Sequence, residues 1–252
     1  MTINAPTREQ IPQLRQLWQQ AFGDTEAFLD SFFSVAFSPE RSRCVSLDGK
    51  AAAALYWFDC TCRGQKMAYL YAVATDAAFQ NQGLCRALMT DTHSHLRSLG
   101  YRGAILVPGS RQLFSLYEKL GYRTCSHIWI FSCTAGAEPV AVRSIGQEEY
   151  AALRRQFLPV GGVVQEGAAL ALLEAQSGFY AGDGVLLAAT LEDHELICSE
   201  LLGDAAAAAG ILAALGATEG QFRAPGGETP FAMFLPLVKN VQPPTYFGLA
   251  LD

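Results

Sequence analysis

Apolar positions near the start of the chain recur at helical spacing. Thr7 and Gln10 have the spacing of a capping box, which marks the beginning of a helix. Gly23 ends this helix, and Asp24 or Thr25 can cap the next one. The apolar faces are formed by Ile11, Leu14, Leu17, Trp18, Ala21 and Phe22, and then by Phe28, Leu29, Phe32, Phe33 and residues 35–37. The pattern therefore predicts two amphipathic helices.

The section that follows has the pattern of β-strands. Residues 43–47 and 51–59 flank Asp48-Gly49, which is a strong hairpin signal. Residues 65–75 continue as a long strand that returns alongside the second one. The two helices are therefore followed by an antiparallel meander.

Helices and strands then alternate up to residue 133. A stripe of leucines predicts a helix from residue 84 to Gly100, and residues 113–120 predict a shorter one. Residues 103–107 are entirely apolar and follow directly after a helix, which predicts a parallel crossover. Residues 123–133 are expected to form one last long strand.

The second half of the chain has a different composition. It is rich in alanine and follows a linker at Glu138-Pro139. Helices are expected at 148–157 and 166–177, an antiparallel strand pair at 184–190 and 195–202, an alanine-rich helix from Asp204 to about Gly216, and strands at 219–224, 231–237 and 246–251. This order repeats the outline of the first half: helices, a strand pair, a helix and strands.

Composition narrows the functional classes. Half of the 252 residues are apolar, and the net charge of −6 argues against nucleic-acid binding. No apolar run reaches membrane-spanning length and no targeting signal precedes the first helix, so we expect a cytoplasmic protein that binds no membrane. The seven cysteines contain no C-x-x-C pair, which favours free thiols in a reducing compartment over structural zinc. His93 and His95 are two apart on a predicted helix, which favours surface side chains over a metal pair. We therefore expect no metal.

The connection between strand 65–75 and the following helix is the strongest candidate for a ligand site. Its polar residues lead into Gly83, where the helix begins. Unpaired backbone N–H groups and the helix dipole at such a start attract anions, above all phosphates. Only one glycine lies in the loop, so an ordinary strand–helix crossover remains the alternative.

Three motifs in the first half resemble those of the GCN5-related N-acetyltransferase (GNAT) superfamily. Gln80–Cys85 is similar to the family's pyrophosphate loop, V-A-T-D-A-A-F before it to the family's lead-in, and L-Y-E-K-L-G-Y (116–122) to the motif after the fifth strand. The resemblance implies a catalytic domain at 1–134 of the α/β (α+β) class, with a mixed, mostly antiparallel sheet flanked by helices. Cys85 stands where a smaller residue is usual, and Ala77 replaces a common proline.

The same resemblance implies acetyl-CoA as co-substrate. Its pyrophosphate would be held by the loop, and its pantetheine arm would pair with Val73, Ala74 and Thr75 like an added strand. An N–H of that strand would face the thioester oxygen. The other positions that the resemblance assigns to the cofactor are Gln80, Asn81, Gln82, Gly83, Leu84, Cys85, Arg86 and Ser110, the last standing where many relatives have asparagine.

The resemblance also implies the catalytic groups. Tyr117 matches the family's general acid for the departing thiolate, its alternative being a core tyrosine. Cys85 as an acyl-carrying nucleophile is disfavoured because no partner base is placed by the sequence. Glu26 and Asp30 lie on the second helix, which borders the acceptor site in this family, and would attract an amine there, although solvated carboxylates on a helix face are the commoner explanation. The general base is not identified.

The tandem arrangement resembles the enhanced intracellular survival type of bacterial acetyltransferases, without their sterol-carrier-like domain. This implies that residues 140–252 form a degenerate GNAT-like domain, which helps to close the acceptor site. The junction 202–208 lacks the long anion loop, so no second cofactor site is expected. In that family a terminal carboxylate reaches the active site, which points to Asp252 as a catalytic group.

The sequence therefore predicts an N-acetyltransferase that moves an acetyl group from acetyl-CoA to a primary amine within a ternary complex. Two alternatives remain open: a non-catalytic acyl-CoA-binding or regulatory module, and transfer of a longer acyl group. The acceptor is a small-molecule or peptide amine, and homo-oligomerisation is left open.

Overall fold

The computed structural model describes residues 1–251. Both expected N-terminal helices are present. Helix α1 spans Ile11–Phe22 and ends at Gly23, whose φ of 76° is in the left-handed region. Helix α2 spans Glu26–Ser31 and runs on into a single π-helical turn, Phe32–Ala36. The Thr25 hydroxyl accepts a hydrogen bond of 3.2 Å from the amide of Phe28, so Thr25 is the N-cap of α2. The side chain of Asp24 is therefore left for another role.

The first sheet has eight strands and combines both halves of the sequence. Its order is β1-β2-β3-β4-β5-β15-β6, with β9 on the far end of β3. The pair β4–β5 is parallel and the other pairs are antiparallel, as expected for a crossover through one helix. The strands are β1 (Thr2–Asn4), β2 (Ser42–Leu47), β3 (Lys50–Cys62), β4 (Gln65–Thr75), β5 (Gly103–Leu106), β6 (Arg123–Thr124), β9 (Val164–Gln165) and β15 (Met233–Pro236).

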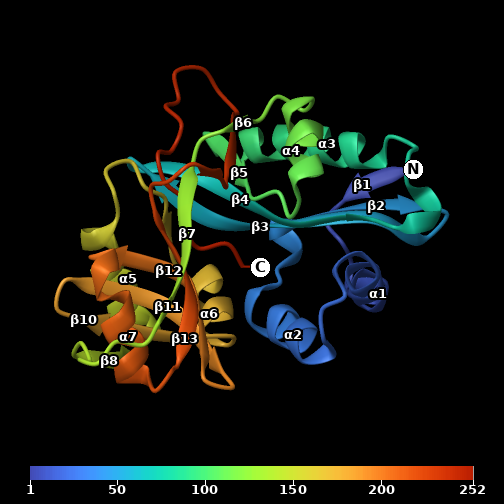
Figure 1. The fold of residues 1–252 in the computed structure, drawn as a ribbon. Coiled ribbons are helices and arrows are strands. Elements are labelled where there is room, and N and C mark those ends of the chain that lie inside the picture. Colours follow the sequence, from blue (N-terminus) through green and yellow to red (C-terminus); the bar gives the residue numbers. More distant parts are fainter. Residues whose placement is uncertain (252) are drawn as a thin grey trace.

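Helices cover both faces of this sheet (Figure 1). Helices α3 (Leu84–Ser98) and α4 (Arg111–Glu118) lie on one face, and α1 and α2 on the other. The alternation along β3 decides which side chain goes where: Leu55 and Trp57 belong to the cluster under α3, whereas Tyr56 belongs to the cluster under α1. The sheet is thus buried on both sides.

The second sheet has seven strands in the order β14-β7-β13-β12-β11-β10-β8. Here too a single parallel pair, β12–β13, is joined through a helix, α7. Helix α7 packs on one face, while α5 and α6 contribute to the core that faces the first sheet. The elements are β7 (His127–Thr134), β8 (Val142–Ile145), α5 (Gln147–Phe157), α6 (Ala168–Glu174), β10 (Gly178–Gly182), β11 (Val185–Glu192), β12 (Glu195–Gly203), α7 (Ala208–Leu215), β13 (Glu219–Pro225) and β14 (Thr229–Pro230).

The expected single strand 123–133 is wrong, because it is two strands in different sheets. β6 pairs with β15 in the first sheet, and β7 pairs with β13 in the second. Ser126 lies between them, is fully buried, and exchanges hydrogen bonds with the backbone of Phe247 at 3.0 and 3.2 Å. In exchange, β15 from the second half lies between β5 and β6. Each sheet therefore contains a strand from the other half of the chain.

The expected strand 246–251 is also not a strand. Only Tyr246 forms an isolated bridge, to Gly162. The segment 246–251 is extended and buried, and side chains rather than a neighbouring strand hold much of its backbone. Ser126 contacts Phe247, and the Gln165 amide donates to the carbonyl of Leu249 at 2.7 Å. A hydropathy pattern cannot distinguish a buried segment held by side-chain hydrogen bonds from a strand held by a neighbouring strand.

His93 is another correction. Its side chain is buried, and its Nε2 lies 2.7 Å from the hydroxyl of Tyr122.

The seven cysteines are free thiols. Within residues 1–251 there is no helix long and apolar enough to cross a membrane.

Candidate active site

The candidate site is a gap in the first sheet. Strands β4 and β5 pair only through Met67–Tyr69 and Gly103–Ile105. β4 continues to Thr75, whereas β5 ends at Leu106, so the second half of β4 has no partner on this side. An unpaired strand edge offers a row of N–H and C=O groups to a ligand.

A β-bulge lies on the same stretch of β4. Tyr71 is opposite Tyr56, and Ala74 is opposite Ala54, so Ala72 and Val73 share the single residue between them on β3. Ala72 has a φ of 48°, a left-handed conformation that is costly for a residue with a Cβ. Bulges of this kind redirect backbone groups and concentrate at functional sites. The bulge lies next to the gap.

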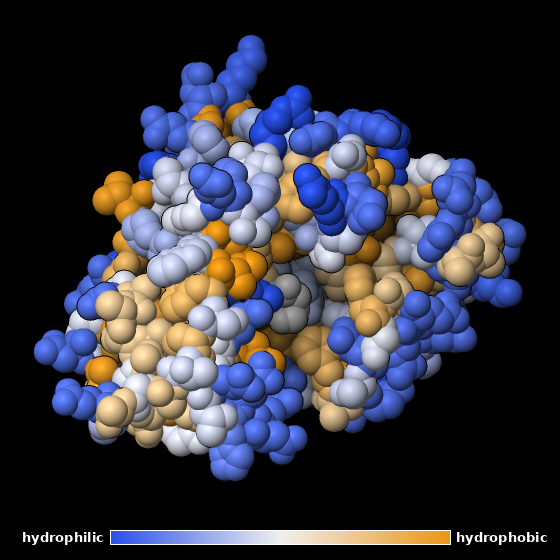
Figure 2. All heavy atoms as spheres, viewed as in Figure 1, coloured by the Kyte–Doolittle hydropathy of each residue, from blue (hydrophilic) through white to orange (hydrophobic). Residues whose placement is uncertain are grey.

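A cavity of about 500 Å³ occupies the gap. It is lined from both halves of the chain, by Trp18, Phe22, Asp24, Phe28, Tyr69, Leu70, Tyr71, Ala72, Val73, Leu106, Val107, Gly109, Leu113, Tyr117, Leu172, Leu173, Gln176, Ser177, Thr190, Ser199, Ala250 and Leu251. Figure 2 shows the surface hollowed near the centre of this face, between the regions of α2 and α6.

The cavity passes through the sheet. Leu70, Leu106 and Tyr117 belong to the core cluster under α3 and α4. Trp18 and Tyr69 line the same cavity but belong to the cluster on the opposite face, under α1. Two ligands entering from opposite faces can therefore meet at the bulge of β4.

The loop before α3 has the properties of an anion site on the α3 side. Gly83 begins the helix with a φ of 79° and has no heavy atom within 4 Å of where a Cβ would be. The first helical bond runs from Ala87 N to Gly83 O, at 3.0 Å. The amides of Leu84, Cys85 and Arg86 therefore precede the ladder, and none of them has an acceptor within residues 1–251. These three amides fit the pyrophosphate of a CoA thioester.

Tyr117 lines the cavity from the side of α3 and α4. It is 6% exposed, and its hydroxyl has no hydrogen-bond partner among the described residues. Burial raises the pKa of Tyr117 well above its ordinary value, and the nearby Cys85 raises it further. The phenol is therefore protonated at neutral pH, as an acid requires. Burial also raises the pKa of Cys85, which keeps that thiol protonated.

The other predicted cofactor positions surround the same region. Val73 lines the cavity, while Ala74 and Thr75 continue the open edge of β4 and pair with β3 on the other side. Ser110 is the N-cap residue of α4 and is exposed. Gln80 and Gln82 donate to the carbonyls of Thr75 and Ala78 at 3.4 Å, which holds the loop together. Asn81, two residues before Gly83, has a φ of 60°.

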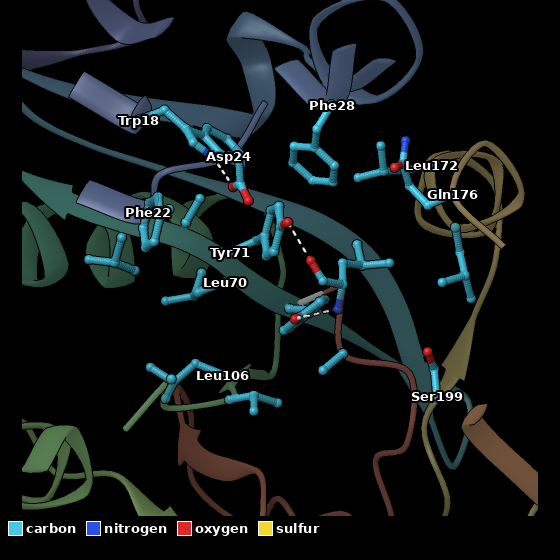
Figure 3. A pocket seen from close by; sticks show the side chains of 18 of the residues that line it. Trp18, Phe22, Asp24, Phe28, Leu70, Tyr71, Leu106, Leu172, Gln176 and Ser199 are labelled. Atoms are coloured by element: carbon cyan, nitrogen blue, oxygen red, sulfur yellow. Dashed lines mark hydrogen bonds between the residues drawn. The ribbon is translucent and has the colours of Figure 1, made fainter. Parts of the chain in front are cut away.

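Glu26 and Asp30 are not among the residues that line the cavity. Both carboxylates lie on the exposed side of α2 and pair with Arg15, at 2.5 and 2.8 Å. The nearby carboxylate that does line the cavity is Asp24, which accepts a hydrogen bond of 2.6 Å from the indole N–H of Trp18 (Figure 3). Sequence reasoning treated Asp24 only as a helix cap. Because Thr25 is the cap, the side chain of Asp24 turns to the cavity instead.

The segment 246–251 brings the second half of the chain to the same place. The hydroxyl of Tyr71 donates to the carbonyl of Leu251 at 2.5 Å, and the amide of Leu251 donates to the hydroxyl of Tyr69 at 3.4 Å. Ala250 and Leu251 line the cavity. Asp252, the predicted catalytic carboxylate, lies outside the described residues.

Comparison with known protein families identifies the first half. Residues 2–125 match the family model described as an acetyltransferase (GNAT) domain. The first half of this chain is a GNAT acetyltransferase domain. A chain with an acetyltransferase domain is an acyltransferase, and the matched residues include the loop before α3, the bulge of β4 and Tyr117. Comparison with curated proteins found no match.

Solved structures similar to this chain extend over both halves. A GCN5-related N-acetyltransferase from Kribbella flavida has 19% identity and a TM-score of 0.71, covering 94% of this chain and 72% of its own. One from Anabaena variabilis has 14% identity and a TM-score of 0.72, with 94% and 73% covered. Eis1 from Mycobacterium abscessus has 12% identity and a TM-score of 0.69, with 94% and 74% covered. At these identities the likeness concerns the fold, a mixed α/β arrangement.

Proposed function

We propose that the protein is an acetyl-CoA-dependent N-acetyltransferase that acetylates a primary amine by direct transfer in a ternary complex. The observation that carries this proposal is the cavity through the sheet, which extends from Leu113 and Tyr117 on the side of α3 and α4 to an aromatic chamber under α1. An acyl donor held on one side and an amine on the other would have their reacting atoms at the same point.

Acetyl-CoA, when bound, supplies an acetyl thioester that an amine can attack. The amides of Leu84, Cys85 and Arg86 would hold its pyrophosphate, and the open edge of β4 would pair with its pantetheine arm. The bulge at Ala72 and Val73 leaves backbone groups outside the β3 ladder, next to the cavity. An N–H there would stabilise negative charge on a carbonyl oxygen.

Tyr117 holds the proton that a departing thiolate needs. Its burial and its high pKa keep the hydroxyl protonated, and no partner within residues 1–251 competes for that proton. On the acceptor side, the backbone of Leu251 is fixed by Tyr69 and Tyr71. Asp252 follows Leu251 directly and is our proposal for the carboxylate that takes the proton of the amine.

The second half, 140–252, is proposed to be a degenerate GNAT-like domain that closes the acceptor side. In support, its elements repeat the order of the first half, including one parallel pair joined by a helix. At the corresponding junction, the Asp204 carboxylate already accepts a hydrogen bond of 2.9 Å from the amide of Ala206. A capping carboxylate would repel an anion, which is consistent with one cofactor site, on α3.

The test is release of CoA thiol from acetyl-CoA in the presence of amines, for wild type and Tyr117→Phe. We expect the variant to lose roughly a hundredfold or more in kcat, the usual contribution of a general acid, while calorimetry shows unchanged CoA binding. If the wild-type protein binds CoA but acetylates no amine, the protein is the non-catalytic binding module instead. Full activity in Tyr117→Phe would remove the acid role.

Deleting Asp252 alone tests the proposed base. We expect turnover to fall with little change in thermal stability. Unchanged turnover would eliminate Asp252 from the mechanism.

A further inference from the structure

The acceptor side of the cavity has an unusual balance of charge. Among the described residues that line the whole cavity, Asp24 is the one carboxylate, and no lysine, arginine or histidine is present. The polar side chains that the described part of the second half contributes are neutral: Gln176, Ser177, Thr190 and Ser199. The remaining side chains that face this chamber are mainly aromatic or aliphatic.

Asp24 is poised to meet a positive charge. One of its oxygens accepts the indole N–H of Trp18, and Figure 3 shows the carboxylate between Trp18 and Tyr71. No lysine or arginine within residues 1–251 forms an ion pair with it; the nearby Arg15 is engaged by Glu26 and Asp30. A half-buried carboxylate without a counterion, facing a cavity, favours a cationic ligand.

The wall around Asp24 is built for an apolar, ring-sized group. Trp18 packs against Tyr71 with ring centroids 5.5 Å apart and against Phe28 at 6.1 Å. Phe22 and Phe28 line the same chamber, and Leu172 and Leu173 of α6 face it from the other half. Aromatic faces also stabilise an ammonium group directly. The chamber therefore combines one anionic point with a broad apolar surface.

This combination discriminates between classes of amines. An amino acid would bring its own carboxylate next to Asp24 and find no basic side chain among the described lining residues. A polyamine or an aminoglycoside would bring several charges, and among the described lining residues Asp24 alone can pair with one of them. An amine with one charge and a hydrocarbon body has neither a carboxylate that Asp24 repels nor additional charges that must be desolvated.

We infer that the acceptor is a hydrophobic primary monoamine, such as an arylalkylamine, and that Asp24 determines this specificity by binding its ammonium group before transfer. The inference rests on the proposed acetyltransferase function and narrows it to one substrate class. Asp24 selects and orients the amine, whereas Tyr117 serves the thiolate.

The first test compares matched amines on the full-length protein. 2-Phenylethylamine and phenylalanine differ only by a carboxylate, and hexylamine and spermidine differ chiefly in charge number. We expect kcat/KM with acetyl-CoA to be at least about tenfold higher for the first member of each pair, because a desolvated unpaired charge is costly. Equal or better use of phenylalanine or spermidine would overturn the inference and leave the acetyltransferase function standing.

Binding provides a readout that needs no turnover. Calorimetric titration of 2-phenylethylamine and phenylalanine into the protein with CoA should show the monoamine binding tighter by a similar factor. If no amine is acetylated but this preference holds, the proposed function fails and the assignment of the chamber stands. If phenylalanine binds as tightly, the assignment fails whatever the activity.

Asp24→Asn tests the assigned residue. We expect KM for 2-phenylethylamine to rise about tenfold or more, with KM for acetyl-CoA and the thermal midpoint near those of wild type. Asp48→Asn, in the exposed turn between β2 and β3, removes the same charge far from the chamber and should leave KM unchanged. An unchanged amine KM in Asp24→Asn would overturn the role of Asp24.

Discussion

The hydroxyl of Tyr71 donates a hydrogen bond of 2.5 Å to the carbonyl of Leu251, a residue 180 positions away in the sequence. Tyr71 directly precedes the bulge of β4, and Leu251 is the last residue of segment 246–251. This contact joins the two halves of the chain inside the cavity. It makes the geometry of the cavity depend on how firmly the segment 246–251 is held in place.

Tyr71→Phe should therefore affect the reaction more than the fold. The ring and its packing against Trp18 are kept, and the hydrogen bond to Leu251, worth about 1 kcal/mol, is lost. We expect kcat/KM for the amine to fall roughly tenfold, about 1.4 kcal/mol, and CoA affinity to stay the same. Steady-state kinetics with calorimetry checks this. A fall in CoA affinity alone would contradict the proposed arrangement.

A buried ion pair holds the beginning of the same segment. Glu200 is fully buried and is paired with Arg154 at 2.6 Å. It also accepts hydroxyl hydrogen bonds of 3.0 Å from Tyr150, on α5, and from Tyr246. A Cβ on Gly248 would lie 2.1 Å from a Glu200 oxygen, so the segment packs directly on this carboxylate.

Tyr246→Phe and Tyr150→Phe form a matched pair. Each removes one 3.0 Å donor from Glu200, so each should lower the free energy of unfolding by about 1–3 kcal/mol in urea titrations. Only Tyr246 belongs to the segment that reaches the cavity, and only its variant should raise KM for the amine. Equal kinetic effects in both variants would mean that Glu200 acts on the fold as a whole.

Gly83→Ala and Gly100→Ala test the anion loop in the same way. The two glycines lie at opposite ends of α3, with φ of 79° and 81° and no atom within 4 Å of a Cβ. Both variants should lose about 1–2 kcal/mol of stability, because a Cβ is disfavoured in the left-handed region. Only Gly83→Ala should weaken CoA binding, by roughly tenfold. The measurement is CoA titration beside thermal unfolding.

Cys85→Ala separates direct transfer from a covalent route. Burial raises the pKa of the Cys85 thiol, so the thiolate needed for an acyl-enzyme is disfavoured at neutral pH. We expect kcat to stay within about threefold of wild type, a small effect compared with loss of a nucleophile. Mass spectrometry of wild type mixed with acetyl-CoA should find no acetyl group on Cys85. An acetylated Cys85 that an amine then discharges would contradict direct transfer.

His93 predicts a pH dependence of stability. Burial lowers the pKa of His93 to about 4, whereas an unfolded histidine has a pKa near 6.5. Below pH 6.5 the unfolded chain binds a proton that the folded chain does not, so stability falls as the pH drops from 6.5 towards 4. The total is up to about 3 kcal/mol.

Urea unfolding of wild type and His93→Gln at pH 7, 6, 5 and 4.5 measures the part of the free energy of unfolding that depends on protonation of His93. The variant lacks the titrating group and should lose less stability than wild type over this range. The carboxylates of the protein contribute equally to the pH dependence of stability in both proteins. Two parallel curves would show that His93 does not carry the effect.

Local patterns were enough to find much of the first half and its loop. The strand Gln65–Thr75 and the start of a helix at Gly83 follow from short-range preferences of the backbone, which any fold must respect. Tyr117 was singled out by the resemblance of its motif to that of the GNAT superfamily, and it lines the cavity. The role of Tyr117 as an acid, like those of Glu26, Asp30 and Asp252, stays a prediction.

Other features depend on contacts between residues far apart in the chain. The exchange of β7 and β15 between sheets, the side-chain pairing of segment 246–251 and the turn of Asp24 into the cavity leave no periodic signal. Asp24 and Thr25 are both favourable N-cap residues. In the structure Thr25 caps α2, whereas Asp24 accepts a hydrogen bond from the indole N–H of Trp18. Hydropathy reports that a side chain is buried but not which partner buries it. Short-range patterns thus predicted the domain and the loop proposed to bind the cofactor, whereas long-range packing determined the cavity proposed to bind the acceptor.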